Sequence, residues 1–221
     1  MIFCLIGTSV WAESIVSTDS IDNKPVELKT QTYQGTYLNL DIFNPISTAW
    51  KNGRFEASLI IDVDLWHRLF PVAEIGIMAA NMSEDTYDYS TTGCFAKLGA
   101  NYNFINFKPD RKYDHTFYAG ARYAYSYNNY SLTNAILENK YWQETGTYES
   151  KKQNSNFGWL EIVVGTRVQI YKDFFMGVAL QIKALGHFYE YTPHNPTYIA
   201  GYGKYGDDVV FGFNYTLSYR F

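Results

Sequence analysis

The chain has 221 residues, with 18 Lys and Arg against 22 Asp and Glu, and a formal net charge of -4. This balance gives no basic footprint for a nucleic acid, and two cysteines are too few for a disulfide scaffold. Aromatic residues reach 19% and charged residues only 18%, which excludes intrinsic disorder. Mean hydropathy is -0.26, as in many soluble proteins, so the 21 Tyr, 15 Phe and 5 Trp need a separate explanation.

The N-terminus resembles an export signal. Residues 1–12 (MIFCLIGTSVWA) are apolar and uncharged and end in Ala, as in the hydrophobic region and cleavage end of a secretory signal peptide. We expect cleavage before Glu13, and, because a basic n-region is missing, a true start further upstream. The polar residues 13–32 are predicted to form a periplasmic tail. No stretch approaches the ~18 consecutive apolar residues of a membrane-spanning helix.

From Tyr33 onward, apolar and polar residues alternate, which indicates strands with one apolar face. The stretch RFEASLIIDVDL at 54–65 is typical. Each such stretch is near or above the ~9–11 residues that a tilted strand needs to cross a bilayer. The eight predicted strands are residues 34–43, 54–65, 72–81, 92–104, 116–128, 158–171, 174–188 and 208–221.

The predicted connections alternate in length. Prolines fall between the strands, with Pro71 just before the third, as expected for a residue that cannot donate to a ladder. Short turns at one rim and longer loops at the other are typical of an outer-membrane barrel with both termini in the periplasm. We therefore predict an all-β fold, an eight-stranded antiparallel up-and-down transmembrane β-barrel over residues 33–221. The short turns are 66–71, 105–115 and 172–173, and the longer loops are 44–53, 82–91, 129–157 and 189–207.

The polar face of these strands carries acids and bases in equal number, interspersed with glycine. A narrow lumen is filled by side chains and must pair its charges, whereas a soluble surface would be denser in Lys and Glu. The alternative is a soluble, lipocalin-like barrel with its apolar face inward around a ligand. The predicted lumen charge network is Glu56, Asp62, Asp64, Glu74, Lys97, Arg122, Glu161, Arg167, Lys183 and Arg220.

Aromatic residues on the apolar face gather at the predicted strand ends. Membrane barrels place Tyr, Trp and Phe there as girdles at the two interfaces. To the periplasmic rim we assign Tyr102, Phe104, Phe117, Phe175, Tyr219 and Phe221, and to the outer rim Tyr123, Tyr125, Tyr127, Phe211 and Phe213.

The C-terminal stretch FGFNYTLSYRF carries aromatic residues at Phe211, Phe213, Tyr215, Tyr219 and Phe221. It resembles the terminal-strand signal of Gram-negative outer-membrane barrels, which the barrel-assembly machinery reads. The architecture is similar to small barrels of the OmpX and OmpA-domain type and to outer-membrane barrel families with no assigned activity. The resemblance implies an outer-membrane location, with membrane lipid and lipopolysaccharide around the wall and the assembly machinery as a partner in biogenesis.

Motifs that carry chemistry are missing from the sequence: HExxH, CxxC, a phosphate-binding glycine loop and GxSxG. We therefore predict no enzyme activity, cofactor or metal, and we assign His67 and His115 to periplasmic turns. The alternative is a membrane enzyme that modifies lipid A at the outer rim. Such an enzyme would use residues from the set His187, His194, Glu190, Asp207 and Asp208.

The longest predicted loop, 129–157, carries Tyr141, Trp142 and Tyr148 among charged residues. Exposed aromatic residues on a loop held by a rigid scaffold are a common binding arrangement. The sequence therefore predicts a structural or surface-interaction role: envelope integrity, adhesion, or binding of an extracellular ligand or protein by this loop. A narrow pore for small solutes is a further alternative.

Overall fold

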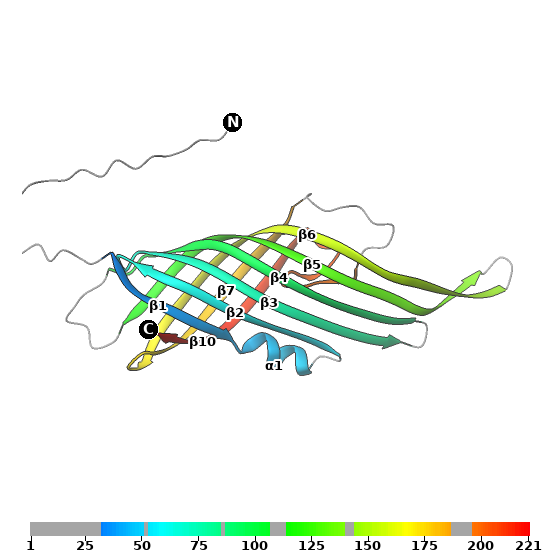
Figure 1. The fold of residues 1–221 in the computed structure, drawn as a ribbon, viewed down its shortest axis with the longest axis horizontal. Coiled ribbons are helices and arrows are strands. Elements are labelled where there is room, and N and C mark those ends of the chain that lie inside the picture. Colours follow the sequence, from blue (N-terminus) through cyan, green and yellow to red (C-terminus); the bar gives the residue numbers. More distant parts are fainter. Residues whose placement is uncertain (1–31, 51–52, 85–86, 107–113, 140–143, 187–195) are drawn as a thin grey trace, which may run out of the picture. The chain divides into compact units, whose positions relative to one another are not determined.

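A computed structural model describes residues 32–50, 53–84, 87–106, 114–139, 144–186 and 196–221. Eight antiparallel strands close into a barrel in the order β1-β10-β7-β6-β5-β4-β3-β2 (Figure 1). This confirms the predicted fold class. The wall strands are β1 (Tyr33–Asp41), β2 (Arg54–Leu65), β3 (Leu69–Glu84), β4 (Tyr87–Asn103), β5 (His115–Asn139), β6 (Glu144–Tyr171), β7 (Phe174–Leu185) and β10 (Val209–Arg220).

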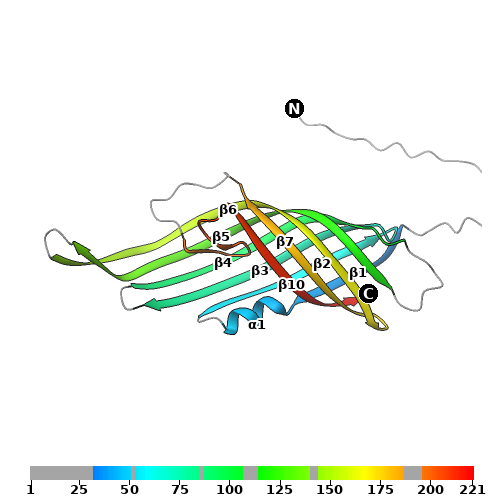
Figure 2. The same ribbon diagram turned by 180° about the vertical axis from the view of Figure 1, so that it is seen from behind.

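The two ends of the barrel differ. We call the end where β1 begins and β10 finishes the terminal end, and the opposite end, from which β5 and β6 project, the ribbon end. Figure 2 shows the same barrel from behind, with β10 and β7 crossing the wall toward the terminal end. The first and last strands close the wall through a register from Tyr37↔Arg220 to Asp41↔Thr216.

The distribution of polarity is opposite to that of a soluble protein. On the outer face, Leu98 and Leu160 are 67% and 63% exposed. On the inner face, Glu74, Lys97 and Glu161 are buried, at no more than 2% exposed. Exposing these leucines to water would cost free energy, and so would burying these charged side chains in an apolar core. Lipid outside and a packed polar lumen inside satisfy both, so this is a membrane-spanning barrel.

The first long connection holds a helix where the sequence predicted a loop at 44–53. Helix α1 (Phe43–Trp50) follows β1 directly, so β1 ends at Asp41 rather than at residue 43. The Asp41 carboxylate caps the helix, accepting a hydrogen bond from the Phe43 N–H at 3.0 Å and one from Asn44 Nδ2 at 2.6 Å. Pro45 lies in the first turn, where its missing N–H is tolerated. No helix among the described residues is long and apolar enough to span a membrane.

Two predicted outer loops are largely strand. The segments predicted as loops at 82–91 and 129–157 contain the ends of β3 and β4 and much of β5 and β6. The β4–β5 pairing stops at Asp88↔Thr133, and β7 stops opposite Trp159, so β5 and β6 continue as a two-stranded ribbon (Figure 1). Their sequence there lacks strict alternation, so periodicity did not reveal these extensions of the strands.

Pro71 lies inside β3 and not before it, which corrects the predicted strand boundary. It is paired with Ala100 of β4. On the other side, the β2 pairing passes from Val72 to Leu69 without including it, so no ladder bond requires its missing N–H. Proline is therefore tolerated here as a near-terminal residue of the strand.

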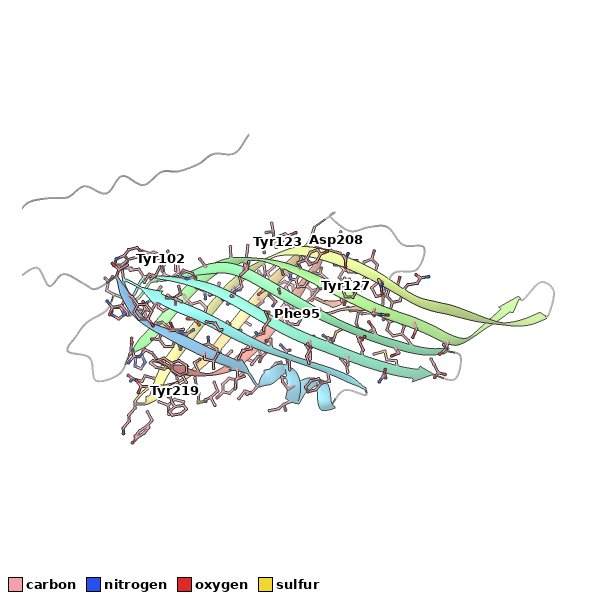
Figure 3. The ribbon with its side chains drawn as sticks, viewed as in Figure 1. Phe95, Tyr102, Tyr123, Tyr127, Asp208 and Tyr219 are labelled. Carbon is pink, nitrogen blue, oxygen red and sulfur yellow. The ribbon has the colours of Figure 1, made fainter. Side chains whose placement is uncertain are left out.

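Aromatic residues occupy both faces of the wall, not only the outer one. Figure 3 shows Tyr102 and Tyr219 near the terminal end, with Tyr123 and Tyr127 further along the barrel. The assignment of Phe175 to the outer girdle is wrong, since its side chain is 1% exposed and lies inside. Other buried aromatic residues are Tyr37, Phe70, Tyr89, Phe95, Tyr118, Tyr130, Phe157, Trp159 and Tyr202.

Candidate functional site

The centre of the lumen holds four charged side chains from consecutive strands, the charge quartet Glu74, Lys97, Arg122 and Glu161. Lys97 Nζ lies 3.2 Å from Glu74 and 3.0 Å from Glu161, and Arg122 lies 2.9 Å from Glu74. The Arg122–Glu161 separation is 3.9 Å. Two acids and two bases cancel, which is what a buried, weakly polarisable interior requires. The quartet ties the neighbouring strands β3, β4, β5 and β6 together on the inner face of the wall.

Toward the terminal end, an arginine sits between a carboxylate and aromatic rings. Arg167 donates from both terminal guanidinium nitrogens to the Asp62 carboxylate at 2.9 Å. Its guanidinium carbon lies 4.3 Å from the ring centroid of Tyr37. The rings of Tyr37 and Phe175 meet edge-on at 5.2 Å, and Phe70 lies 6.2 Å from Tyr37. These five side chains, from strands around the wall, fill the lumen at this level.

At the terminal rim, ion pairs connect strand ends to turns. Arg220 lies 3.2 Å from Asp114 and 3.9 Å from Asp173. His67 Nδ1 lies 2.9 Å from the Asp64 carboxylate, as part of the tight β2–β3 turn. The two Arg220 pairs are partly exposed to solvent, so each contributes little by itself, whereas Asp64 is buried. Their effect is to anchor the rim around the aromatic side chains beneath it.

At the ribbon end, the described part of the last connection, from residue 196 on, folds into the lumen, contrary to the predicted outer loop 189–207. Residues 196–206 form what we call the hairpin plug, which contains β8 (Tyr198–Ile199) and β9 (Gly203–Lys204). Lys183 Nζ donates to the Gly201 carbonyl at 2.8 Å. The Ala200 N–H donates to Asn128 Oδ1, also at 2.8 Å. The backbone groups of a buried turn are thus partnered by the wall.

Apolar packing holds the hairpin plug against β3–β6. At its turn, Gly201 has φ +77, and a Cβ there would lie 2.6 Å from Cγ of Phe95. Only glycine fits such a left-handed position so close to a ring. Burial, with Asp208 and Asp207 nearby, raises the pKa of the Tyr202 hydroxyl, which donates to the Asp207 carbonyl at 2.6 Å. The buried cluster comprises Met78, Phe95, Ala124, Phe157, Trp159, Ile199, Ala200 and Tyr202.

The structure places nine of the ten residues of the predicted lumen network among the buried side chains. Arg220 is partly exposed at the terminal rim. Glu56 pairs with Arg54 at 2.6 Å, and Lys183 holds the hairpin plug rather than an acid. The nine are Glu56, Asp62, Asp64, Glu74, Lys97, Arg122, Glu161, Arg167 and Lys183.

The residues of the C-terminal signal project outward from the wall. Phe211 and Phe221 are 79% and 69% exposed, and Phe213 packs edge-on against Phe43 of α1 at 4.8 Å. Tyr219 packs on Phe174 and on Phe221 at about the same separation, 5.0 and 4.8 Å. An aromatic row on the last strand thus remains accessible from the lipid side.

The predicted binding loop, 129–157, falls largely within the β5–β6 ribbon. Tyr148 belongs to β6, where it is opposite Ala135 of β5 in the strand register. Tyr141 and Trp142 lie outside the described residues, as do His187, Glu190 and His194 and the predicted signal segment and tail up to residue 31. Asp207 and Asp208 are exposed. Within the described part of the chain, no three His, Cys, Asp or Glu side chains come together where they could hold a metal ion.

Sequence reasoning missed the hairpin plug as part of the site. The segment IAGYGKYG carries three glycines in six residues, which is a turn signal, and alternates them with tyrosine. Turn propensity alone does not say whether a hairpin points into the lumen or out of it. The direction follows from the contacts of Gly201 and Ala200 with Phe95, Lys183 and Asn128.

Together these features define a class: a small membrane-spanning β-barrel whose lumen is filled by its own side chains at both ends. The chain belongs to the family described as Domain of unknown function (DUF6048), which matches residues 1–221. No curated protein matches it.

The solved structures that are similar to this chain include the following two. Neisserial surface protein A is 13% identical with a TM-score of 0.43, over 86% of this chain and 100% of that one. Ail, the attachment invasion locus protein of Yersinia pestis, is 11% identical with a TM-score of 0.42, over 85% of this chain and 94% of that one.

Proposed function

We propose that this protein is an outer-membrane barrel of a Gram-negative bacterium that acts at the cell surface, through its projecting β5–β6 ribbon. The observation that carries the proposal is the contrast between a filled lumen and an extended ribbon. The wall supplies an anchor, and the ribbon supplies the surface that a partner can reach. Passage of solutes and catalysis are not parts of this proposal.

The filled lumen supports a role outside the barrel. A pore needs a continuous aqueous path, and wide water-filled channels occur in barrels of about 16–18 strands. Here the hairpin plug occupies one end of an eight-stranded lumen, and Arg167 with Tyr37, Phe70 and Phe175 occupies the other. The charge quartet lies between them with its charges paired.

The ribbon supports binding through its backbone. Among the described residues, β6 from 144 to 152 pairs only with β5, because β7 ends opposite Trp159. This edge therefore carries N–H and C=O groups that a further strand can use. An extended peptide added to an open sheet edge gains main-chain hydrogen bonds. The partner we propose is an extended polypeptide segment at the cell surface.

The outer-membrane location draws support from the last strand. Its outward aromatic row, ending at Phe221, is the feature that we propose the barrel-assembly machinery engages during biogenesis. Membrane lipid and lipopolysaccharide would then surround the wall. Cell fractionation with heat-modifiable gel mobility tests this directly. Recovery from the soluble periplasm with unchanged mobility after boiling would contradict the proposed location.

A ribbon deletion tests the surface role. Tyr130 pairs with Gln153, and its hydroxyl donates to the Gln153 side chain at 3.0 Å, so residues 131–152 can be replaced by Asn-Gly as a tight hairpin turn. We expect cells displaying this variant to lose at least tenfold in binding to immobilised carboxymethylated casein, an extended polypeptide, while the barrel keeps its heat-modifiable mobility.

A matched triple variant, Tyr141→Ser with Trp142→Ser and Tyr148→Ser, keeps the ribbon but removes its aromatic residues. We expect it to retain most of the binding if the backbone edge carries the interaction. Equal binding by the deletion variant and the unaltered protein would refute the surface role.

A further inference from the structure

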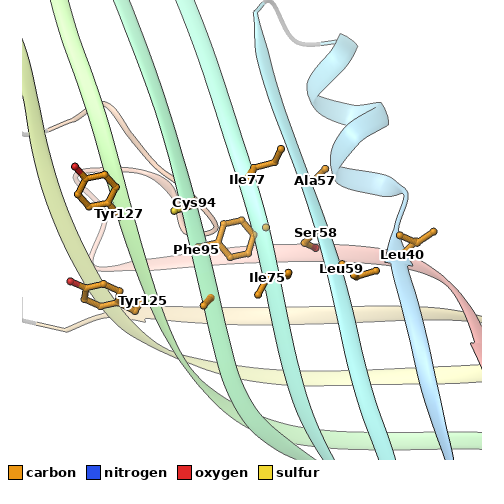
Figure 4. Close-up of a pocket in the computed structure, with 12 residues that line it drawn as sticks. Leu40, Ala57, Ser58, Leu59, Ile75, Ile77, Cys94, Phe95, Tyr125 and Tyr127 are labelled. Atoms are coloured by element: carbon orange, nitrogen blue, oxygen red, sulfur yellow. The ribbon is translucent and has the colours of Figure 1, made fainter.

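The lipid-facing wall of β1–β5 is hollowed by a groove of about 760 Å³. Figure 4 shows Leu40 and Ala57 at the end of the groove next to α1, and the rings of Tyr125 and Tyr127 at the opposite end. Every lining residue is uncharged, and almost all of the lining is apolar. The groove lies on the outer face of the wall and is separate from the filled lumen.

The strand register builds the groove from two adjacent rows of outward side chains. The first row is Leu40, Leu59, Ile75, Ala96 and Tyr125, each residue directly opposite the next on neighbouring strands. The second row is Ala57, Ile77, Cys94 and Tyr127. The short side chains of Ala57, Cys94 and Ala96 lie between longer neighbours, and this difference in length produces the hollow.

A glycine keeps the floor of the groove thin. Gly76 lies between the two isoleucines on β3, and a Cβ at this position would lie 2.2 Å from Cζ of Phe95. The Phe95 ring, which packs with the hairpin plug, therefore lies directly beneath the groove. The floor is thus fixed by a buried aromatic residue and does not depend on mobile side chains.

Polarity changes along the wall toward the ribbon end. The next row is Phe55, Ala79, Thr92 and Asn129, which is polar on β4 and β5, and it borders a second hollow of about 440 Å³, which shares Ile77, Cys94 and Tyr127 with the first. Beyond it, Ser90 Oγ donates to Asn81 Oδ1 at 2.8 Å. An occupant of the groove thus meets hydrocarbon first and then uncharged hydrogen-bonding groups. This is the order of groups in a membrane lipid that lies with its chain toward the bilayer centre.

The dimensions fit one hydrocarbon chain in one leaflet. From β1 to β5 the groove crosses four inter-strand gaps of ~4.8 Å, or ~19 Å in all. Strands of such barrels tilt by roughly 35–45°, so a groove running across them inclines by about 50° to the membrane normal. Its depth is then ~12 Å, within the ~15 Å of half a bilayer core.

We propose that this groove binds one acyl chain of a zwitterionic phospholipid, with the ester region at Thr92 and Asn129. The rows at 81, 90, 92 and 129 carry no Lys or Arg, so nothing there neutralises the two phosphates of lipid A, whereas the single phosphate of a zwitterionic phospholipid is offset by the ammonium of its own headgroup. A second copy of the chain would present another convex wall, and two convex walls meet only along a line. Such a contact is smaller than the about 800 Å² that a specific interface needs from each partner, so a second copy is not the occupant. The groove is independent of the ribbon and of the surface role.

Filling the groove tests the proposal. The double variant Ala57→Leu with Ala96→Leu adds bulk at two of its short side chains. The matched control is Ala121→Leu, an exposed outward alanine of β5 outside the lining. Folding is checked by heat-modifiable mobility, and binding of dipalmitoyl phosphatidylethanolamine is measured by native mass spectrometry of the full chain released from detergent.

We expect the unaltered protein and the Ala121→Leu control to retain one phospholipid, and the double variant to bind it at least tenfold more weakly. A second readout uses the exposed Cys94 thiol, whose alkylation by N-ethylmaleimide should slow at least fivefold in the presence of the phospholipid. Equal retention by all three proteins, tighter binding of lipid A than of phospholipid, or a dimer that disappears in the double variant would each overturn the proposal.

Discussion

Replacing Arg167 with methionine should destabilise the barrel more than any substitution of a rim charge. Methionine keeps the length of the side chain but removes its charge and hydrogen bonds. Asp62, which is 1% exposed, would lose the partner that contacts both of its carboxylate oxygens. Tyr37 would lose the guanidinium that lies 4.3 Å from its ring centroid. A buried carboxylate would remain without a compensating charge.

The expected size of the effect follows from this burial. Removing one partner of a buried ion pair costs about 3–5 kcal/mol, because the remaining charge stays desolvated. Loss of the cation–π contact adds ~1 kcal/mol. Neutralising both partners, as in Arg167→Met with Asp62→Asn, should recover most of the loss. The amide oxygen introduced by the second substitution can still accept a hydrogen bond from the side chain of Asn39, which now donates to Asp62.

The measurement is equilibrium urea unfolding of the protein reconstituted in lipid vesicles, followed by tryptophan fluorescence and by heat-modifiable mobility. The matched control is Arg68→Met. Arg68 is exposed at the β2–β3 turn, where it donates to the Tyr102 hydroxyl at 3.0 Å, so its loss should cost under ~1 kcal/mol. A loss for Arg167→Met that matches the control, or a double variant less stable than the single one, would refute the buried-pair argument.

Three further predictions concern the connections and the lumen. Asp41→Ala removes the cap of α1 and should cost about 1 kcal/mol in the same unfolding assay, whereas Asp41→Asn should cost less. Gly201→Ala forces a left-handed residue against Phe95 and should expose the hairpin plug, 196–206, to protease; unchanged cleavage would show that the plug tolerates the strain. In planar bilayers the unaltered protein should conduct almost no current. Deleting 196–206 should raise the current measurably only when Phe175→Ala also opens the terminal end, and high conductance without these changes would contradict a filled lumen.

The alternation of residue types determined much of this protein without reference to tertiary contacts. A stretch such as 54–65 specifies a strand, and its parity assigns Glu56 and Asp62 to the face opposite Phe55. Repeated eight times with turns between, that pattern predicted the closed antiparallel barrel that is observed. It succeeded because side-chain direction in a strand depends only on position along the chain.

Several features depended on contacts that periodicity does not contain. Phe175 is not one of them: it has the same parity as Gln181 and Lys183 in β7, so the alternation itself places it on the inner face, and its assignment to the girdle departed from that parity. The start of α1 depends on a cap from Asp41, because its eight residues are too few for a helical period to stand out. The extension of β5 and β6 depends on pairing between the two strands alone.

The hairpin plug shows most clearly where the sequence ends and the tertiary structure begins. Its glycines and tyrosines specified a turn, which local backbone preference determines. Whether that turn entered the lumen depended on a carbonyl acceptor for Lys183, an amide partner for Asn128 and a flat ring at Phe95, from three different strands. The sequence by itself thus determined the strands and which of their faces is apolar. Only the closed wall, which brings distant strands within contact distance, decided what fills the lumen and where the outer face is hollowed.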